Sequence, residues 1–76
     1  MERDIYSEQV KVERKTISFE LKENPRGRFL KVTEDVGGRR DAIIIPATGL
    51  DLLREALDHV IQASVAAGPC ETGDAE

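Results

Sequence analysis

Residues 22–32 read KENPRGRFLKV, and this stretch decides the fold. Its centre, Asn24 to Gly27, has the composition of a tight turn, because Pro25 presets φ for the second turn position and Gly27 tolerates a positive φ. Leu30 and Val32 follow at alternate positions, which is the period of a half-buried strand. The stretch therefore predicts a β-hairpin.

Working outward in both directions, the chain continues to alternate. Three apolar residues alternate with polar ones before the turn, at Ile17, Phe19 and Leu21, and a weaker alternation precedes them at Val10 and Val12. Residues 13–15 are a weak candidate turn between these two segments. We expect strands from about residue 6 up to the Asn24–Gly27 turn.

After the hairpin, Gly37 and Gly38 permit a tight return into a fourth strand at about residues 40–45. This strand contains the unbroken apolar run 42–45, and such a run indicates burial on both faces of a sheet. Burial on two faces in so short a chain points to a partner.

The period changes after Pro46 to that of a helix. The apolar residues then fall on one helical stripe, at Leu50, Leu53, Leu57, Val60 and Ile61. Thr48 is a candidate cap, and Gly68-Pro69 ends the helix. The predicted class is α+β: a four-stranded antiparallel sheet, followed by one helix that leaves the sheet with one face covered.

Size and charge limit the function. A 76-residue chain is one domain, and a monomer of this length buries only about 60% of its unfolded surface, which again favours a partner. The net charge is −4, but residues 11–40 hold nine basic and five acidic side chains. A local charge of +4 is compatible with a nucleic-acid partner, because charges farther away than about 8–10 Å are screened.

Catalytic, metal and membrane functions find no support in the sequence. The one histidine, His59, lies in the helical segment without a nucleophile or metal-ligand spacing around it. Cys70 is the one cysteine, so no internal disulfide is expected. The charged N-terminus and the lack of a membrane-spanning segment predict a soluble cytoplasmic protein.

Alternation separates Phe29 from Leu30, so the two cannot point to the same side of a strand. Phe29 then shares the outer face with Lys31 and, on the preceding strand, Lys22. An aromatic ring among cations suits unpaired bases, which stack on rings while lysines meet phosphates. The alternation alone favours a different interpretation, in which the ring covers a second apolar layer or a dimer contact, beside a solvated hairpin tip.

At this point the sequence resembles the PUR family of purine-rich-element-binding proteins. Residues 22–30 are similar to the repeat signature of the family, and residues 43–50 with 54–57 resemble its last strand and helix. The resemblance covers about residues 8–66. It implies a Whirly-like ββββα repeat with a curved sheet, two copies of which intertwine as a homodimer in single-repeat bacterial members. Two features depart from the pattern: the second strand has Ile17, Ser18 and Phe19 where family repeats often carry two aromatics, and Pro25 replaces a more usual polar residue.

The resemblance also implies binding of purine-rich, GGN-type single-stranded DNA or RNA with local unwinding of duplex. The residues that match the family's base and backbone contacts are Lys22, Asn24 and Arg26, and the matching stacking aromatic is Phe29. With their basic neighbours, the candidate nucleic-acid-binding residues are Lys22, Asn24, Arg26, Arg28, Phe29 and Lys31.

The sequence thus predicts an N-terminal extension (1–7), a PUR repeat (8–67) and a disordered acidic tail (68–76). The expected function is single-strand binding in transcriptional or translational regulation, in the cytoplasm or on the nucleoid, without cofactor or catalysis. The alternative is a dimerisation or protein-interaction module that has the fold but little nucleic-acid affinity, which the acidic net charge favours.

Overall fold

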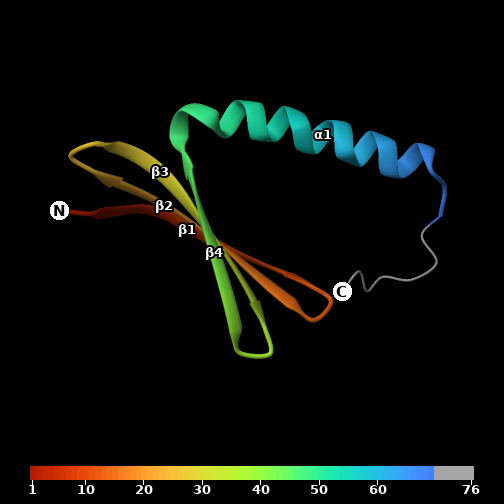
Figure 1. Cartoon of the computed structure of the whole chain (residues 1–76), viewed down its shortest axis with the longest axis horizontal. Coiled ribbons are helices and arrows are strands. Elements are labelled where there is room, and N and C mark those ends of the chain that lie inside the picture. The colour runs from red at the N-terminus through yellow and green to blue at the C-terminus, as the bar shows by residue number, and fades with distance from the viewer. Residues whose placement is uncertain (70–76) are drawn as a thin grey trace.

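The computed structural model describes residues 1–69, and they form a four-stranded antiparallel meander followed by one helix (Figure 1). The strands lie in the order β1-β2-β3-β4. The elements are β1 (Arg3–Val12), β2 (Lys15–Asn24), β3 (Gly27–Val36), β4 (Arg39–Pro46), the short 3-10 turn η1 (Ala47–Gly49) and α1 (Leu50–Ala66). The predicted fold class, four antiparallel strands and then a helix, is confirmed.

Each hairpin turn contains a residue with positive φ. Gly27 has φ 144°, Gly37 and Gly38 have φ 61° and 92°, and Glu13 has φ 57° in the turn between β1 and β2. Positive φ is accessible to glycine without steric cost and is uncommon for glutamate, which explains why the first turn had the weakest signal in the sequence. The other two turns lie where the sequence predicts them.

The strand register divides the side chains between two faces, since directly opposed residues share a face. Leu21 lies opposite Leu30, which lies opposite Ile45. We call this side the apolar face; its apolar residues are Tyr6, Val10, Val12, Ile17, Phe19, Leu21, Leu30, Val32, Val36, Ile43 and Ile45. The other side, the polar face, comprises Asp4, Ser7, Gln9, Lys11, Thr16, Ser18, Glu20, Lys22, Asn24, Phe29, Lys31, Thr33, Asp35, Arg40, Ala42, Ile44 and Pro46.

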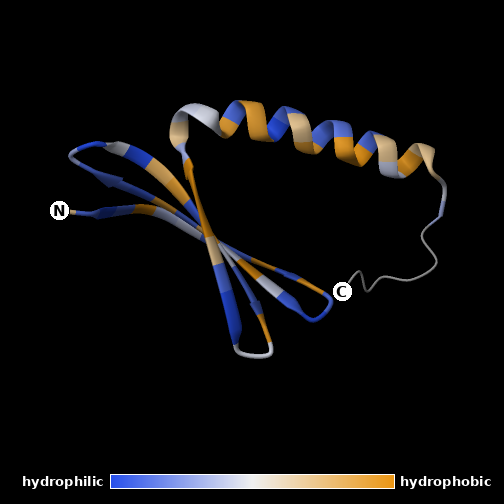
Figure 2. Cartoon of the chain, in the orientation of Figure 1, coloured by the Kyte–Doolittle hydropathy of each residue, from blue (hydrophilic) through white to orange (hydrophobic). Residues whose placement is uncertain are grey.

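The helix does not cover the sheet of its own chain, so the predicted coverage of one sheet face stays a prediction for the dimer. Figure 1 shows α1 running away from the end of β4, and Figure 2 shows apolar bands repeating along it. Within residues 1–69 no residue is buried, and the helix residues Leu53 and Leu57 are 44% and 57% exposed. The predicted run at 42–45 likewise stays open, with Ile43 and Ile44 exposed on opposite faces. The turn η1, which starts immediately after Pro46, directs the helix outward.

The first strand begins earlier than the sequence indicates. It includes Arg3–Val12, so most of the predicted extension (1–7) belongs to the sheet. Its register shifts between Asp4 and Tyr6, which is a β-bulge, and the extra residue breaks the alternation that sequence reading relies on.

The helix termini agree with the prediction at one end only. Gly68 has φ 95° and follows the last helical turn, as expected for a C-terminal stop. Thr48 does not cap the helix: it lies inside η1, and the N-cap residue is Gly49, without a side-chain hydrogen bond. Of the predicted acidic tail, residues 68 and 69 are described. The rest, which includes Cys70, lies outside the described residues. In the described part of the chain no helix is both long and apolar enough to span a bilayer.

Candidate nucleic-acid interface

The polar face brings together an aromatic ring and two lysines. Lys22 lies opposite Phe29 across β2 and β3, and Glu20 lies opposite Lys31 two residues farther along. On the other side of Phe29 lies Pro46 of β4. The predicted separation of Phe29 from Leu30 onto opposite faces is therefore confirmed by the register, and the ring of Phe29 is only half-buried.

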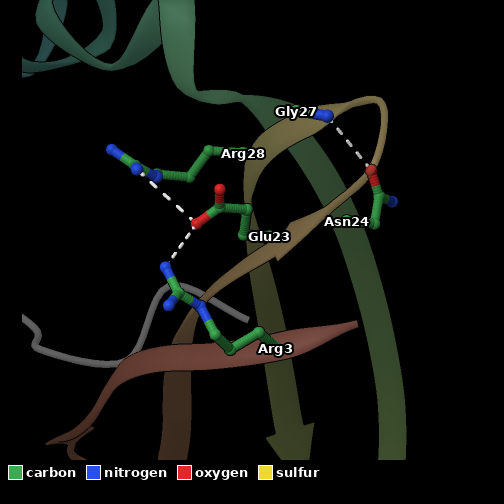
Figure 3. A network of polar contacts seen from close by, with 5 residues as sticks. All are labelled: Arg3, Glu23, Asn24, Gly27 and Arg28. Atoms are coloured by element: carbon green, nitrogen blue, oxygen red, sulfur yellow. Dashed lines mark hydrogen bonds and ion pairs between the residues drawn. The ribbon is translucent and has the colours of Figure 1, made fainter. Parts of the chain in front are cut away.

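The turn between β2 and β3 is held by Asn24. Its Oδ1 accepts hydrogen bonds from the backbone N–H of Arg26 at 2.9 Å and of Gly27 at 3.2 Å. Figure 3 shows the Asn24 side chain beside the loop, with its amide nitrogen directed away from the turn. The oxygen thus fixes the turn, and the amide nitrogen is presented as a hydrogen-bond donor next to the strand that carries Phe29.

A shallow hollow of about 590 Å³ lies at this end of the sheet. Its apolar lining consists of Phe29, Ile44 and Pro46. Asn24 and the basic residues Arg26 and Arg28 add polar groups to its lining. An apolar surface bordered by amide and guanidinium donors matches the chemistry of an unpaired base, which has a flat π-face and polar edges.

The face continues beyond the ring toward the hairpin between β3 and β4. A second hollow of about 350 Å³ is lined by two cations, Lys31 and Arg40, by three acids, Glu20, Asp35 and Asp41, and by Gln9, Thr16, Ser18, Thr33 and Ala42. Arg40 belongs to this face, where its Nε lies 3.1 Å from Asp35 Oδ2. The register places Arg40 on the same face as Lys31.

Lys22 is not freely available on this face. Its Nζ lies 3.2 Å from Asp4 Oδ1 and 3.8 Å from Glu2 Oε1, and its side chain is only 19% exposed. The hydrogen bond and charge of Asp4 raise the pKa of Lys22 above its ordinary value, so the amine stays protonated. No local pattern predicts this contact, because the two acids are about 18 residues away and are brought in by the bulged strand.

Arg28 is separated from the other candidates. It lies opposite Glu23, on the apolar-face side, with its Nη2 3.6 Å from Glu23 Oε1. The same oxygen accepts a hydrogen bond of 2.7 Å from Arg3 (Figure 3). The Arg3 contact, followed by the charge of Arg28, holds the pKa of Glu23 below its usual value. The guanidinium of Arg28 is thus committed to Glu23, although the residue borders the hollow.

The site therefore differs from the predicted residue set in three ways. Four predicted residues lie around one surface, namely Phe29, Lys31, Asn24 and Arg26. Lys22 lies on the same surface, but its amine is already paired with Asp4. Arg28 is directed toward Glu23 instead. Ile44 is an additional wall of the hollow that the sequence reading assigned to burial.

Comparison with known proteins agrees with this geometry. Residues 1–74 match the family described as "PurA ssDNA and RNA-binding protein". The chain is also 35% identical over 60 residues to "Transcription factor Pur-alpha 1" of Arabidopsis thaliana. The match covers 79% of this chain and 20% of that relative, so the chain corresponds to about a fifth of its length. The four-stranded sheet with one following helix and the match across nearly the whole sequence lead to the same conclusion: this chain belongs to the PurA family of single-stranded DNA- and RNA-binding proteins.

Proposed function

We propose that the protein is a homodimer that binds unpaired, purine-rich DNA or RNA across its polar face. The observation that carries this proposal is the half-buried ring of Phe29 on the polar face, with Lys22 opposite it on the neighbouring strand. A base stacks on the ring of Phe29, while the Asn24 amide and Arg26 contact base edges or phosphate. Lys31, farther along the polar face, contacts a further phosphate. In a duplex each base pair is stacked between its neighbours and has no π-face open to such a ring, so the same contact favours opened strands over duplex.

The dimer follows from the apolar surface that one copy leaves in water. Eleven apolar residues of one sheet face and a helix with a long apolar stripe have no cover within residues 1–69, where nothing is buried. Burying one large apolar side chain is worth about 1.5–3 kcal/mol, so a fold in which none of them is fully buried does not offset its conformational entropy. A second copy supplies the complementary surface, with each helix laid against the apolar face of its partner.

This arrangement assigns the two faces of the sheet to different tasks. The apolar face is used for assembly, which leaves both polar faces of the dimer for nucleic acid. A role in regulating transcription or translation fits a protein of this kind, since such a dimer can hold or open a purine-rich single strand.

One experiment tests the binding and a second the assembly. Fluorescence anisotropy with labelled oligonucleotides compares purine with pyrimidine, single with double strand, and DNA with RNA. Tightest binding to purine-rich single strands, with log affinity falling linearly with log salt, is the expected result. Equal binding to pyrimidine strands or to duplex would contradict the proposed preference. Sedimentation equilibrium should find a dimer at micromolar concentration, and a stable folded monomer would contradict the assembly.

A second candidate is a dimeric interaction module with little affinity for nucleic acid. It is favoured by the net charge of −4 and by the acids that already pair Lys22. A dimer that binds none of the oligonucleotides even in dilute buffer would select this alternative.

A further inference from the structure

The N-terminal end of β1 reaches the candidate interface at Lys22. Asp4 lies directly opposite Lys22 in the sheet, and the 3.2 Å contact between its Oδ1 and Lys22 Nζ is the shorter of the two that the amine makes with acids. Glu2 supplies the second contact and also lines the hollow beside Phe29. Two carboxylates therefore occupy the space around Lys22 where phosphate oxygens would have to enter.

This contact depends on the bulge. Tyr6 lies opposite Leu21, so a regular antiparallel ladder would place Ile5 opposite Lys22 and Asp4 opposite Glu23. The register shift between Asp4 and Tyr6 inserts one extra residue, which moves Asp4 next to the lysine instead. Bulges are known for redirecting side chains in this way. Without it, the carboxylate of Asp4 would face the carboxylate of Glu23, and Lys22 would have an apolar neighbour.

We infer that Asp4 and Glu2 compete with nucleic-acid phosphate for Lys22, so that the first strand sets the affinity and the salt dependence of the interface. The inference rests on the proposed function. Before binding, two carboxylates surround a single lysine charge, so the net charge at this corner of the polar face is negative. A phosphate that takes the lysine must displace them, so the exchange replaces one ion pair by another and yields little net electrostatic gain.

The competition has a consequence for selectivity. Phosphates are common to all strands, whereas stacking on Phe29 and hydrogen bonding to Asn24 depend on the base being unpaired and accessible. Weakening the phosphate contribution at Lys22 raises the relative share of the base contacts. The paired acids thereby reduce binding to any polyanion more than binding to an unpaired purine strand.

The test compares two variants that each remove one negative charge. Asp4→Asn removes the competitor, whereas Glu13→Gln removes a carboxylate in the turn at the opposite end of β1. Both change the net charge by the same amount, so the difference between them reports the local contact. Each is titrated as full-length protein with a labelled purine-rich single-stranded 12-mer at several salt concentrations.

D4N should bind about two- to fivefold more tightly than E13Q at low salt, which is the range for loss of one exposed ion-pair competitor. Its plot of log affinity against log salt should be steeper by about 0.7, the value for one additional phosphate neutralised on a single strand. In a Lys22→Ala background the same Asp4→Asn change should have no effect beyond that of E13Q.

A separate readout needs no nucleic acid. Loss of the Asp4 contact lowers the pKa of the Lys22 amine, so mild acetylation of Lys22, followed by mass spectrometry, should be faster in D4N than in the wild type and E13Q. Equal binding by D4N and E13Q, while the wild type binds the strand, would overturn the inference and leave the proposed function standing. Absence of binding by all three proteins at low salt would overturn the proposed function itself, and the inference with it.

Discussion

Lys22 lies directly opposite Phe29 in the antiparallel pairing of β2 and β3, on the face of the sheet that carries the hydroxyl and charged residues. The pairing places an ammonium group and an aromatic ring on adjacent strands, whose directly opposed Cβ atoms are typically about 4.5–5.5 Å apart. Lys22 and Phe29 are therefore the central pair of the candidate interface, and substitutions can test its residues one at a time.

Replacing Phe29 by alanine should weaken binding to a purine-rich single strand by about 1–3 kcal/mol, the usual contribution of one base stacked on an aromatic side chain. The ring lies on the polar face, so the dimer should persist. Anisotropy titration and sedimentation of the same sample measure the two properties. Unchanged affinity would mean that the ring is structural.

Phe19 provides the matched control, because it is the other phenylalanine of the chain and lies on the apolar face opposite Val32. In the proposed dimer its ring is covered by the partner. Phe19→Ala should therefore lower the free energy of unfolding by about 3–5 kcal/mol, as for a buried aromatic. Denaturant unfolding measures this loss, and the same variant at position 29 should have a much smaller effect.

Asn24→Asp separates the turn from the interface. Aspartate keeps an oxygen that can accept from the backbone N–H groups of Arg26 and Gly27, and it removes the amide donor. Thermal stability should change little, while the affinity for single strands should fall severalfold because a donor is lost and a negative charge is added. A variant that binds normally would exclude the Asn24 amide from the interface.

Arg26→Ala should reduce affinity and flatten the salt dependence by about 0.7 in the slope of log affinity against log salt, if its guanidinium neutralises one phosphate. Arg39→Ala is the comparison, because Arg39 lies opposite Val36 on the apolar-face side, in the hairpin between β3 and β4. That variant should keep the wild-type slope. Equal slopes for the two variants would show that Arg26 contributes only long-range charge.

The hairpin around residues 22–32 could be predicted because its signals are local. Proline and glycine fix the turn at Asn24–Gly27, and strict alternation on both sides separates Phe29 from Leu30. Side chains alternate between the two faces of a strand, so the register of one hairpin determines the face of every residue in it. The candidate interface follows from the same alternation, and the family resemblance selected the exposed ring over the apolar-layer interpretation.

The rest depended on contacts that leave no periodic trace. Asp4 reaches Lys22 through a bulge, and a bulge breaks the alternation that would reveal it. Arg28 is directed toward Glu23, which Arg3 also contacts, and these ion pairs across strands cannot be derived from sequence spacing. The helix has the amphipathic pattern of one that covers a sheet, but the pattern does not specify whose sheet.

Acid should weaken the sheet through Glu23. Its pKa is lowered in the fold, by the Arg3 hydrogen bond first and by Arg28 as well, so below the usual glutamate range the unfolded chain binds the proton more readily than the folded one. The contribution of Glu23 to stability is therefore complete above its unfolded pKa, near 4.5, and is lost as the pH falls through the lower value of the folded state.

Glu23→Gln cannot titrate, so its unfolding free energy should fall below that of the wild type at pH 7 and approach it near pH 3. Urea unfolding followed by circular dichroism across this range, at one protein concentration, measures the gap, and Glu13→Gln serves as the variant that removes a carboxylate far from Arg3 and Arg28. A gap between Glu23→Gln and the wild type that stays constant from pH 7 to pH 3 would show that the two arginines do not stabilise the folded sheet through this carboxylate.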